Sequence, residues 1–354
     1  MTYTKLYVIL TLTLTVTLTE IGGNMKYITL KMVAEKAEVS VNTASRAINN
    51  RPDINLETKK RVLQIAKELG YIRNAAAVAL RTKKTGTIGV VIADNRNPFY
   101  AEVLNGMEEA AREKNYHIIL ANTQRDYKKE EEAINLLLAK RVDGLLITPV
   151  QDKDDDIKNL IDANIPFVVV GRDFENIEVD AVYNDEVKGG FLATEYLIKK
   201  GHKRIALING FLHKSPAKGR LEGYKKALKE YGIPFDGALV SFGDIDVKDG
   251  HERTKQMLGK NLDFTAIFSY NDMMAFGVMQ AIREKGLRIP EDIGLVGYDD
   301  IPFSSLISPS LTTIRLKKQD LGIESVELLL SRINGSRKKI KKVMLGVELT
   351  IRKT

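Results

Sequence analysis

A short segment near the N-terminus contains side chains that can recognise the edges of DNA base pairs. Asn42 can pair with adenine N6 and N7, Arg46 can pair with guanine O6 and N7, and Val41 can contact a thymine methyl group. The hydroxyls of Thr43 and Ser45 can bind phosphate oxygens. An ordinary polar helix face could have the same composition, so this interpretation depends on the elements that position these residues.

A second group of polar and aromatic residues follows predicted strands later in the chain. Ligands of parallel α/β sheets bind at the carboxyl ends of the strands, so this group is a candidate binding site. Its arginine, asparagine and aspartate supply donors and acceptors suited to sugar hydroxyls, and its cations would also bind a phosphate or carboxylate. Asn271 could instead be only a helix cap, and Asp299 only a turn residue. The candidates are Phe99, Tyr100, Arg172, Lys214, Arg220, Asn271 and Asp299.

The sequence contains no pattern typical of an enzyme or a metal protein. It has no cysteine, and its four histidines are not paired at metal-ligand spacing. Phosphate loops and the GxGxxG and GxSxG motifs are missing. The acidic run over residues 152–156 favours a solvated helix start over a metal site. We therefore predict no catalytic residues, no metal and no cofactor.

The positive charge of the chain is concentrated in one segment. The formal net charge is +8 over 354 residues. Residues 25–85 contain thirteen Lys and Arg against five Asp and Glu, and the remainder is balanced. Such asymmetry indicates a polyanionic partner for that segment, although a merely basic soluble domain would show it too.

The segment that contains the base-reading side chains has the pattern of a helix-turn-helix. Thr29 is a predicted N-cap of a first helix and also a candidate DNA contact, and Ser40 is a predicted cap of a second helix at 41–49. Glu38 lies in the turn, at a position that needs a positive φ. A third helix is predicted at 56–69, ended by Gly70.

From residue 87 onward, apolar runs alternate with amphipathic helical segments. Apolar strands of this kind are buried on both faces, so the alternation predicts parallel, doubly wound α/β sheets, and the length fits two lobes. The predicted strands are 87–93, 117–121, 143–148, 166–170, 204–208, 266–269 and 293–297, with a last strand at 343–351.

Residues 1–24 are expected to lie outside this fold. The apolar run 8–18 is too short to span a bilayer, which needs roughly 20 residues. No small-x-small cleavage site follows it. We therefore expect no membrane anchor. Residues 21–24, Ile-Gly-Gly-Asn, can be encoded by a string that contains a purine-rich ribosome-binding sequence, so we expect translation to start at Met25.

The chain resembles the LacI/GalR family of bacterial regulators over essentially residues 25–354. The blocks that show it include ITLKMVAEKAEVSVNTASRAINN, YLIKKGHKRIALING, FSYNDMMAFGVMQAIREKGLRIPEDIGLVGYDDI and SPSLTTIR. The resemblance implies a helix-turn-helix head at 25–73 followed by a periplasmic-binding-protein-like sensor at 86–354. It places one lobe at about 86–171 and 314–340, and the other at about 172–313 with the last strand.

The resemblance also implies how such a protein would work. A hinge helix at 74–85 would fold in the DNA minor groove, with Leu80 wedged into a base step and Ala77 allowing close pairing of two copies. A homodimer would bind a near-palindromic, double-stranded operator in the cytoplasm. A small-molecule effector, a sugar or sugar phosphate, would bind between the lobes and control repression.

Two other classes of protein share parts of this pattern. A periplasmic sugar-binding protein has the same two-lobed fold, but it would need a cleavable signal and no basic head. An α/β enzyme would need a catalytic constellation. Within the favoured class, an activator and a regulator that responds to a partner protein remain alternatives.

Overall fold

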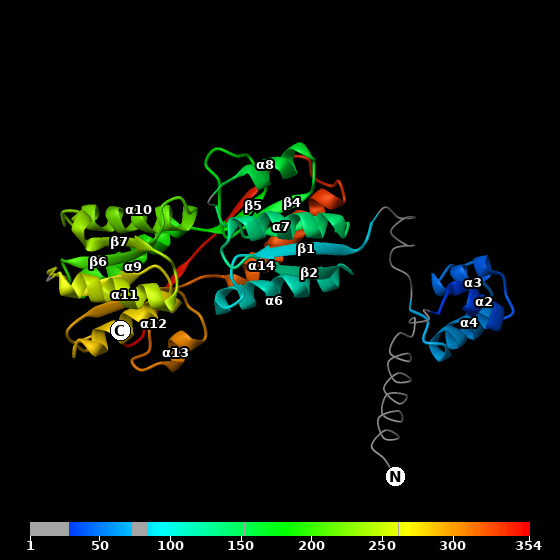
Figure 1. The fold of residues 1–354 in the computed structure, drawn as a ribbon, viewed down its shortest axis with the longest axis horizontal. Helices are drawn as coiled ribbons and strands as arrows, with labels where there is room; N and C mark the ends of the chain where they lie inside the picture. The colour runs from blue at the N-terminus through cyan, green and yellow to red at the C-terminus, as the bar shows by residue number, and fades with distance from the viewer. Residues whose placement is uncertain (1–27, 73–83, 152, 261) are drawn as a thin grey trace, which may run out of the picture. The chain divides into compact units, whose positions relative to one another are not determined.

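The computed structural model of the protein describes residues 28–72, 84–151, 153–260 and 262–354 (Figure 1). The chain divides into two compact units, one ending at Lys83 and one spanning Lys84–Thr354. The predicted leader at 1–24 and most of the predicted hinge at 74–85 lie outside the described residues. Within the described ranges, no helix is both long enough and apolar enough to cross a membrane.

The first unit contains the predicted three-helix head. Thr29 accepts a hydrogen bond from the Met32 amide at 3.3 Å, and Ser40 accepts one from the Thr43 amide at 3.0 Å. Both caps are confirmed. Small buried side chains, including Ala34, Ala44 and Ala47, let the helices approach closely around a compact core. The helices are α2 (Leu30–Lys36), α3 (Val41–Ile48) and α4 (Leu56–Glu68).

Two positions in the head have the backbone conformation that the sequence predicted. Glu38, in the turn between α2 and α3, has φ = 52°. Gly70, just after α4, has φ = 67°. Glycine adopts this left-handed region freely, whereas a glutamate is sterically disfavoured there. The turn at Glu38 is therefore held by the packing of the helices on either side rather than by local preference.

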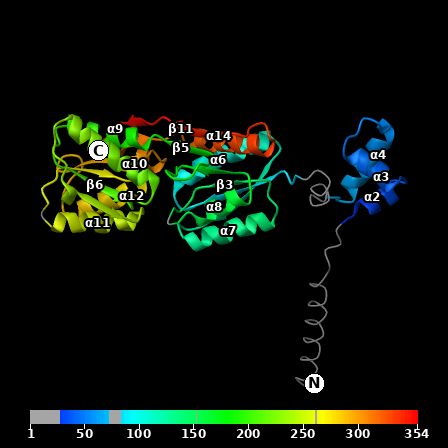
Figure 2. The ribbon, with the colours of Figure 1, turned by 90° about the horizontal axis from the view of Figure 1, so that it is seen from above.

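The first lobe of the second unit has a parallel sheet with the order β11-β5-β4-β3-β1-β2. Helices α6 and α14 cover one face of this sheet, and α7 and α8 cover the other (Figure 2). Its strands are β1 (Thr87–Ile92), β2 (His117–Asn122), β3 (Leu145–Ile147), β4 (Phe167–Val170), β5 (Ala181–Asn184) and β11 (Lys342–Leu345); its helices are α6 (Pro98–Glu113), α7 (Tyr127–Ala139), α8 (Asp155–Asp162) and α14 (Lys318–Ile333).

The second lobe repeats this plan with the strand order β12-β10-β9-β8-β6-β7, in which only β12 is antiparallel to its neighbour. Helices α9 and α10 cover one face, and α11 and α12 cover the other. The elements are β6 (Ile205–Gly210), β7 (Val240–Gly243), β8 (Ala266–Ser269), β9 (Gly294–Asp299), β10 (Thr312–Arg315), β12 (Glu348–Thr350), α9 (Glu186–Lys199), α10 (Ser215–Glu230), the 3-10 helix η1 (Gly237–Leu239), α11 (Val247–Gly259), α12 (Asp272–Glu284) and α13 (Phe303–Leu306).

The lobe boundaries differ from the sequence-based expectation. β5 pairs with β4 in the first sheet, so the chain first crosses after Asn184 and not near Gly171. Gly171, with φ = 70°, instead begins the loop that returns the chain to that sheet. The second crossing lies between β10 and α14, a few residues after the predicted one. The predicted last strand is two strands, β11 in the first sheet and β12 in the second.

Candidate functional site

The exposed face of α3 presents the predicted base-reading side chains. Ala44 and Ala47 are fully buried against the other head helices, which fixes the rotation of α3. Val41, Asn42 and Arg46 consequently point into solvent, and 46% of the Val41 surface is exposed. An exposed valine beside an exposed asparagine and arginine is unusual for a purely structural helix and fits contact with base edges.

The hydroxyl residues and Arg46 already have partners within the head. The Thr43 hydroxyl lies 2.9 Å from that of Ser40, and Thr29 caps α2. Both hydroxyls can still donate to a phosphate. The Arg46 guanidinium forms an ion pair with Asp53, so base contact would require exchange of that partner. Ala77 and Leu80, the two predicted hinge contacts, lie outside the described residues.

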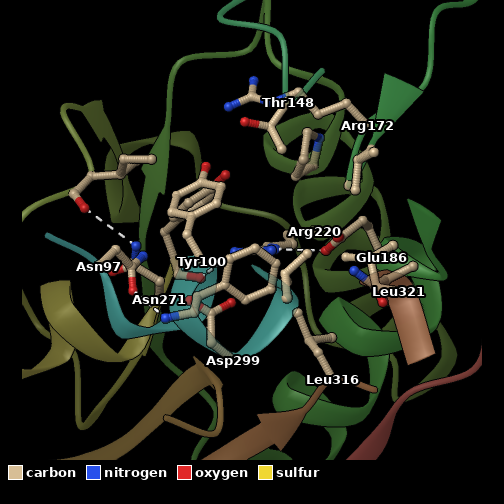
Figure 3. A pocket seen from close by; sticks show the side chains of 18 residues that line it. Asn97, Tyr100, Thr148, Arg172, Glu186, Arg220, Asn271, Asp299, Leu316 and Leu321 are labelled. Atoms are coloured by element: carbon tan, nitrogen blue, oxygen red, sulfur yellow. Dashed lines mark hydrogen bonds and ion pairs between the residues drawn. The ribbon is translucent and has the colours of Figure 1, made fainter. Parts of the chain in front are cut away.

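A cavity of about 50 Å³ lies between the two lobes at the carboxyl ends of their strands (Figure 3). Six of the seven predicted effector contacts line it: Phe99, Tyr100, Arg172, Arg220, Asn271 and Asp299. Figure 3 shows Thr148 and Arg172 on one side of the cavity and Asp299 and Leu316 on the opposite side. The fold therefore brings together predicted residues as distant in the sequence as Phe99 and Asp299.

Lys214 is the exception, because it is not among the residues that line the cavity. It is the N-cap residue of α10, and its amide donates to the Phe211 carbonyl at 3.1 Å. Its position on the same loop as Arg220 suggested a shared site. Arg220, further along α10, lines the cavity, whereas Lys214 does not.

Arg220 is the most enclosed cation at the cavity, with 4% of its surface exposed. Its Nε donates to Glu186 at 2.8 Å, and its guanidinium lies 3.6 Å from the ring centre of Tyr298 and 4.1 Å from that of Tyr270. Burial acts to lower the pKa of Arg220, but Glu186, the two tyrosines and Asp299 together outweigh this and the pKa is raised. Arg220 therefore stays charged and rigidly placed.

Asp299 is the complementary carboxyl group, at the end of β9 with φ = 107°. Burial raises its pKa well above the usual range, and Arg220 opposes this shift. No described residue donates a hydrogen bond to its carboxylate. The backbone is fixed by Lys318, whose Nζ donates to the Asp299 carbonyl at 2.8 Å. A buried acceptor on a strained, tethered backbone is positioned to bind ligand hydroxyls.

Asn271 has the structural role that the sequence left open, and it also borders the cavity. Its Oδ1 accepts from the Met274 amide at 2.8 Å, and its Nδ2 donates to the Ile245 carbonyl at 3.2 Å. The side chain thus caps α12 and uses its main bonding groups within the protein. Its contribution to a ligand would be smaller than that of Asp299.

Sequence reasoning missed several polar residues that border the cavity. They are Asn97, Thr148, Asn184, Glu186 and Tyr270. Asn184 ends β5, a strand too short to stand out in the sequence, and its buried Oδ1 has no partner among the described residues. Glu186 is recognisable as a site residue only from its ion pair with Arg220, which the sequence does not show. Asn97, before Pro98, has the signature of a helix cap, which hid its second role.

A hydrogen-bond network joins the two lobes beside the cavity. Arg172 donates to Gln151 Oε1 at 3.1 Å, and the Ser215 amide donates to the same oxygen at 3.1 Å. Gln151 Nε2 donates to the Asp173 carbonyl at 2.9 Å, and Ser215 Oγ accepts from the Asp173 amide. Gln151 and Arg172 belong to the first lobe and Ser215 to the second. We call these four residues the Gln151 latch.

Among the described residues, no group of three histidines or carboxylates could hold a metal ion. Asp154 and Asp155 lie at the start of α8, as expected for a solvated helix start. Asp156 differs, because it is buried beside Glu130 of α7. The site as a whole offers paired charges, amides and aromatic rings, and this combination suits binding of a small polar molecule.

Family comparisons match both units. Residues 29–74 match the model described as "Bacterial regulatory proteins, lacI family". Residues 85–353 match the model described as "Periplasmic binding proteins and sugar binding domain of LacI family". The two matches lie in the order predicted from the sequence, and together they cover nearly all described residues.

Individual relatives are similar over almost their full length. The chain is 38% identical to the HTH-type transcriptional repressor PurR of Pasteurella multocida, covering 92% of this chain and 98% of the relative. It is 36% identical to the ribose operon repressor of Haemophilus influenzae, with the same coverage. The structure of the Lac repressor dimer bound to operator and the anti-inducer ONPF aligns with a TM-score of 0.84 at 32% identity, over 93% of this chain and 99% of that one. These relatives are repressors and not enzymes.

Proposed function

The chain belongs to the lacI family of bacterial regulatory proteins, and on this basis we propose that it is a repressor whose hold on DNA is weakened by a bound sugar or sugar phosphate. The observation that supports this most directly is the cavity between the lobes, where Arg220 and Asp299 face a space lined by both lobes. A ligand with different affinity for two lobe arrangements shifts the equilibrium between them.

The proposed DNA partner is a near-palindromic operator, bound in the cytoplasm through α3. Val41, Asn42 and Arg46 would contact bases, while Thr29, Thr43 and Ser45 would contact phosphates. Ala77 and Leu80 would act in the minor groove once the hinge folds. Arg46 would exchange Asp53 for a guanine edge.

A homodimer is the proposed functional unit, because two related half-sites require two heads. The edge strand β2 supports this, since 41% of Ile119 and 43% of Leu120 are exposed on a strand whose outer edge pairs with no other described strand. Edge strands with exposed apolar side chains favour association. A second copy at this edge would cover them.

The proposed ligand class follows from the chemistry of the lining. Arg220 and Arg172 supply donors, Asp299 and Glu186 supply acceptors, and aromatic rings can pack against a sugar face. A ligand phosphate or carboxylate would find two cations there. A panel of sugars, sugar phosphates and purines in a thermal-shift assay would identify the class, since a specific ligand raises the melting temperature by mass action.

The test of the whole proposal is operator binding with and without the identified ligand. A gel shift with DNA from upstream of the gene should show a complex that Asn42→Ala weakens by about 1–3 kcal/mol and that the ligand disrupts. Lys203→Ala, an exposed change in the second lobe, is the matched control. A complex that is unaffected by Asn42→Ala would contradict the assignment of α3.

A further inference from the structure

The loop between α14 and β11 is a concentrated basic surface on the first lobe. No Asp or Glu occurs between Glu327 and Glu348, whereas six Lys and Arg do. The second unit as a whole, with this loop included, is close to charge balance. A local excess of this size within a balanced domain indicates an anionic partner.

Part of this charge is neutralised by the fold. Asp180 accepts from Arg332 at 2.6 Å and from Arg337 at 2.6 Å, which ties the loop to the start of β5. The pKa of Asp180 is lowered, since these bonds outweigh the effect of its burial. Lys342 pairs with Asp173 at 2.8 Å. The arginines therefore shape the loop, and the remaining lysines are available for a partner.

Lys338, Lys339 and Lys341 are exposed. The Lys341 amide donates to Asp180 at 2.8 Å, but the ammonium group of none of the three forms an ion pair with a described carboxylate. Some helix lysines of this unit pair with an acid one turn away, as Lys158 does with Asp154 and Lys226 with Glu222. The loop has no acidic residue in its own sequence, so the charges of its three neighbouring lysines add to one another. We call them the loop lysines.

The loop lies where the head joins this unit. Lys84, the first described residue after the linker, donates from Nζ to Asn334 Oδ1 at 2.6 Å, at the end of α14. Figure 2 shows the end of α14 and the start of β1 at the same end of the lobe. The cavity lies at the opposite, carboxyl ends of the strands. The basic surface and the attachment of the DNA-binding head therefore share one end of the lobe.

The length of the linker limits how far this surface can be from DNA. Residues 73–83 can span at most about 3.3–3.6 Å each, so roughly 40 Å separates Ile72 from Lys84 at the extreme. DNA held by the head is therefore always within tens of ångströms of the loop, whatever the arrangement of the units. The DNA duplex bound by the head is therefore the polyanion that this chain itself brings close to the loop.

We propose that the loop lysines contact the phosphate backbone of DNA that flanks the operator. This inference rests on the proposed function, because the head must first bind the duplex. The contacts are electrostatic and independent of base sequence. They lengthen the stretch of DNA that the protein contacts beyond the bases read by α3. They also give the second unit its own contact with DNA, and movement of the lobes could change that contact.

The first experiment compares two triple variants of the full chain on long duplex DNA as a function of salt. Lys338→Ala/Lys339→Ala/Lys341→Ala should weaken binding at low salt and flatten the salt dependence by about 0.9 in log–log slope for each phosphate that is no longer neutralised. Base preference should not change. The control variant, Lys203→Ala/Lys229→Ala/Lys285→Ala, removes the same charge from the second lobe and should retain the wild-type slope. Equal slopes in the two variants would overturn the inference.

A second experiment uses the absence of cysteine from the chain. Lys339→Cys, labelled with an iron chelate that cleaves nearby DNA, should cut the duplex just outside the operator, whereas labelled Lys229→Cys should not. Cleavage by neither protein, while both still bind the operator, would overturn the inference alone. A wild-type chain that binds no duplex would overturn the proposed function as well, so the two failures are distinguishable.

Discussion

Glu130 and Asp156 form a buried acid pair between α7 and α8. Glu130 Oε2 accepts from the Val150 amide at 2.8 Å, whereas its other oxygen and both oxygens of Asp156 have no partner among the described residues. Two buried carboxylates without a cation cannot both ionise cheaply. Burial, followed by the charge of Asp156, raises the pKa of Glu130 to about 8. We infer that the pair shares one proton at neutral pH.

This pair predicts an unusual pH dependence of stability. Between about pH 4.5 and 8 the folded state keeps a proton that the unfolded state has released, so the free energy of unfolding should fall by about 1.4 kcal/mol per pH unit. Glu130→Gln should reduce this fall, because the amide can donate to Asp156. Urea unfolding at pH 5 and pH 8 would measure it, with the exposed Glu132→Gln as control. The same slope in Glu130→Gln and wild type would exclude a shared proton.

Asp299 offers the cleanest variant of the cavity. Arg220→Ala would leave Glu186 as an unpaired buried charge and cost about 3–5 kcal/mol of stability. A loss of ligand binding in that variant could then result from unfolding and not from a missing contact. Asp299→Asn keeps the shape, and no described residue donates a hydrogen bond to the carboxyl group that it replaces. We expect it to weaken ligand binding at least tenfold, or about 1.4 kcal/mol, while operator affinity is unchanged. Calorimetric titration of the ligand would check this, and wild-type affinity would place the ligand elsewhere.

At the scale of elements, local signals were sufficient for the head and insufficient for the sheets. Caps at Thr29 and Ser40 are decided by neighbouring residues, so the helices could be predicted with nearly correct ends. β5 has four residues and pairs with β11, about 160 positions later. No local pattern marks such a strand, and the first lobe boundary was misplaced for that reason. The sequence could not show that Lys214 lies outside the lining of this cavity, because the path of α10 depends on tertiary packing.

Pairs of glycines set the spacing between helices that bear cavity residues. An added Cβ at Gly190 of α9 would collide with the Arg220 carbonyl, and one at Gly223 of α10 would collide with the Val187 carbonyl. Gly106 of α6 and Gly322 of α14 are related in the same way, as are Gly250 and Gly277 of α11 and α12. The close contact between α9 and α10 is what places Glu186 and Arg220 within ion-pair distance.

Gly190→Ala should therefore affect both stability and ligand binding. Overpacking of this kind costs about 1–3 kcal/mol, and the displaced α10 would move Arg220 away from Glu186. The control is Gly259→Ala, since nothing lies within 4 Å of an added Cβ there. Thermal unfolding and ligand titration of both variants would measure the effects. Unchanged ligand affinity in a folded Gly190→Ala protein would show that α10 does not position the site.

At the scale of the whole second unit, the cavity is too small for its proposed ligand. Its volume of about 50 Å³ is well below the roughly 300–1,000 Å³ of typical small-molecule sites. A sugar can enter only if the lobes or the lining side chains move. The sequence could predict the residues of the cavity, but not its size, because the size depends on the angle between lobes joined by three crossings.

The Gln151 latch opposes such movement, since the hydrogen bonds that join Ser215 of the second lobe to Gln151 and Asp173 of the first hold the lobes at the present spacing. If ligand entry breaks the latch, Gln151→Ala should bind ligand more tightly, by up to the 1–3 kcal/mol or so that these bonds contribute, or about 5–150-fold. Gln151 already has φ = 63°, and alanine adds no strain beyond what glutamine bears.

Lys218→Ala is the matched control, because the Lys218–Glu175 pair is exposed and contributes little. Calorimetric titration of the identified ligand into both variants and the wild type would separate the cases. Weaker binding in Gln151→Ala would mean that the latch persists in the bound state and that the cavity enlarges by side-chain movement instead. Tighter binding would mean that effector entry competes with the hydrogen bonds between the lobes. Ligand binding at the cavity would then change the angle between the lobes, and control of DNA binding requires such a link.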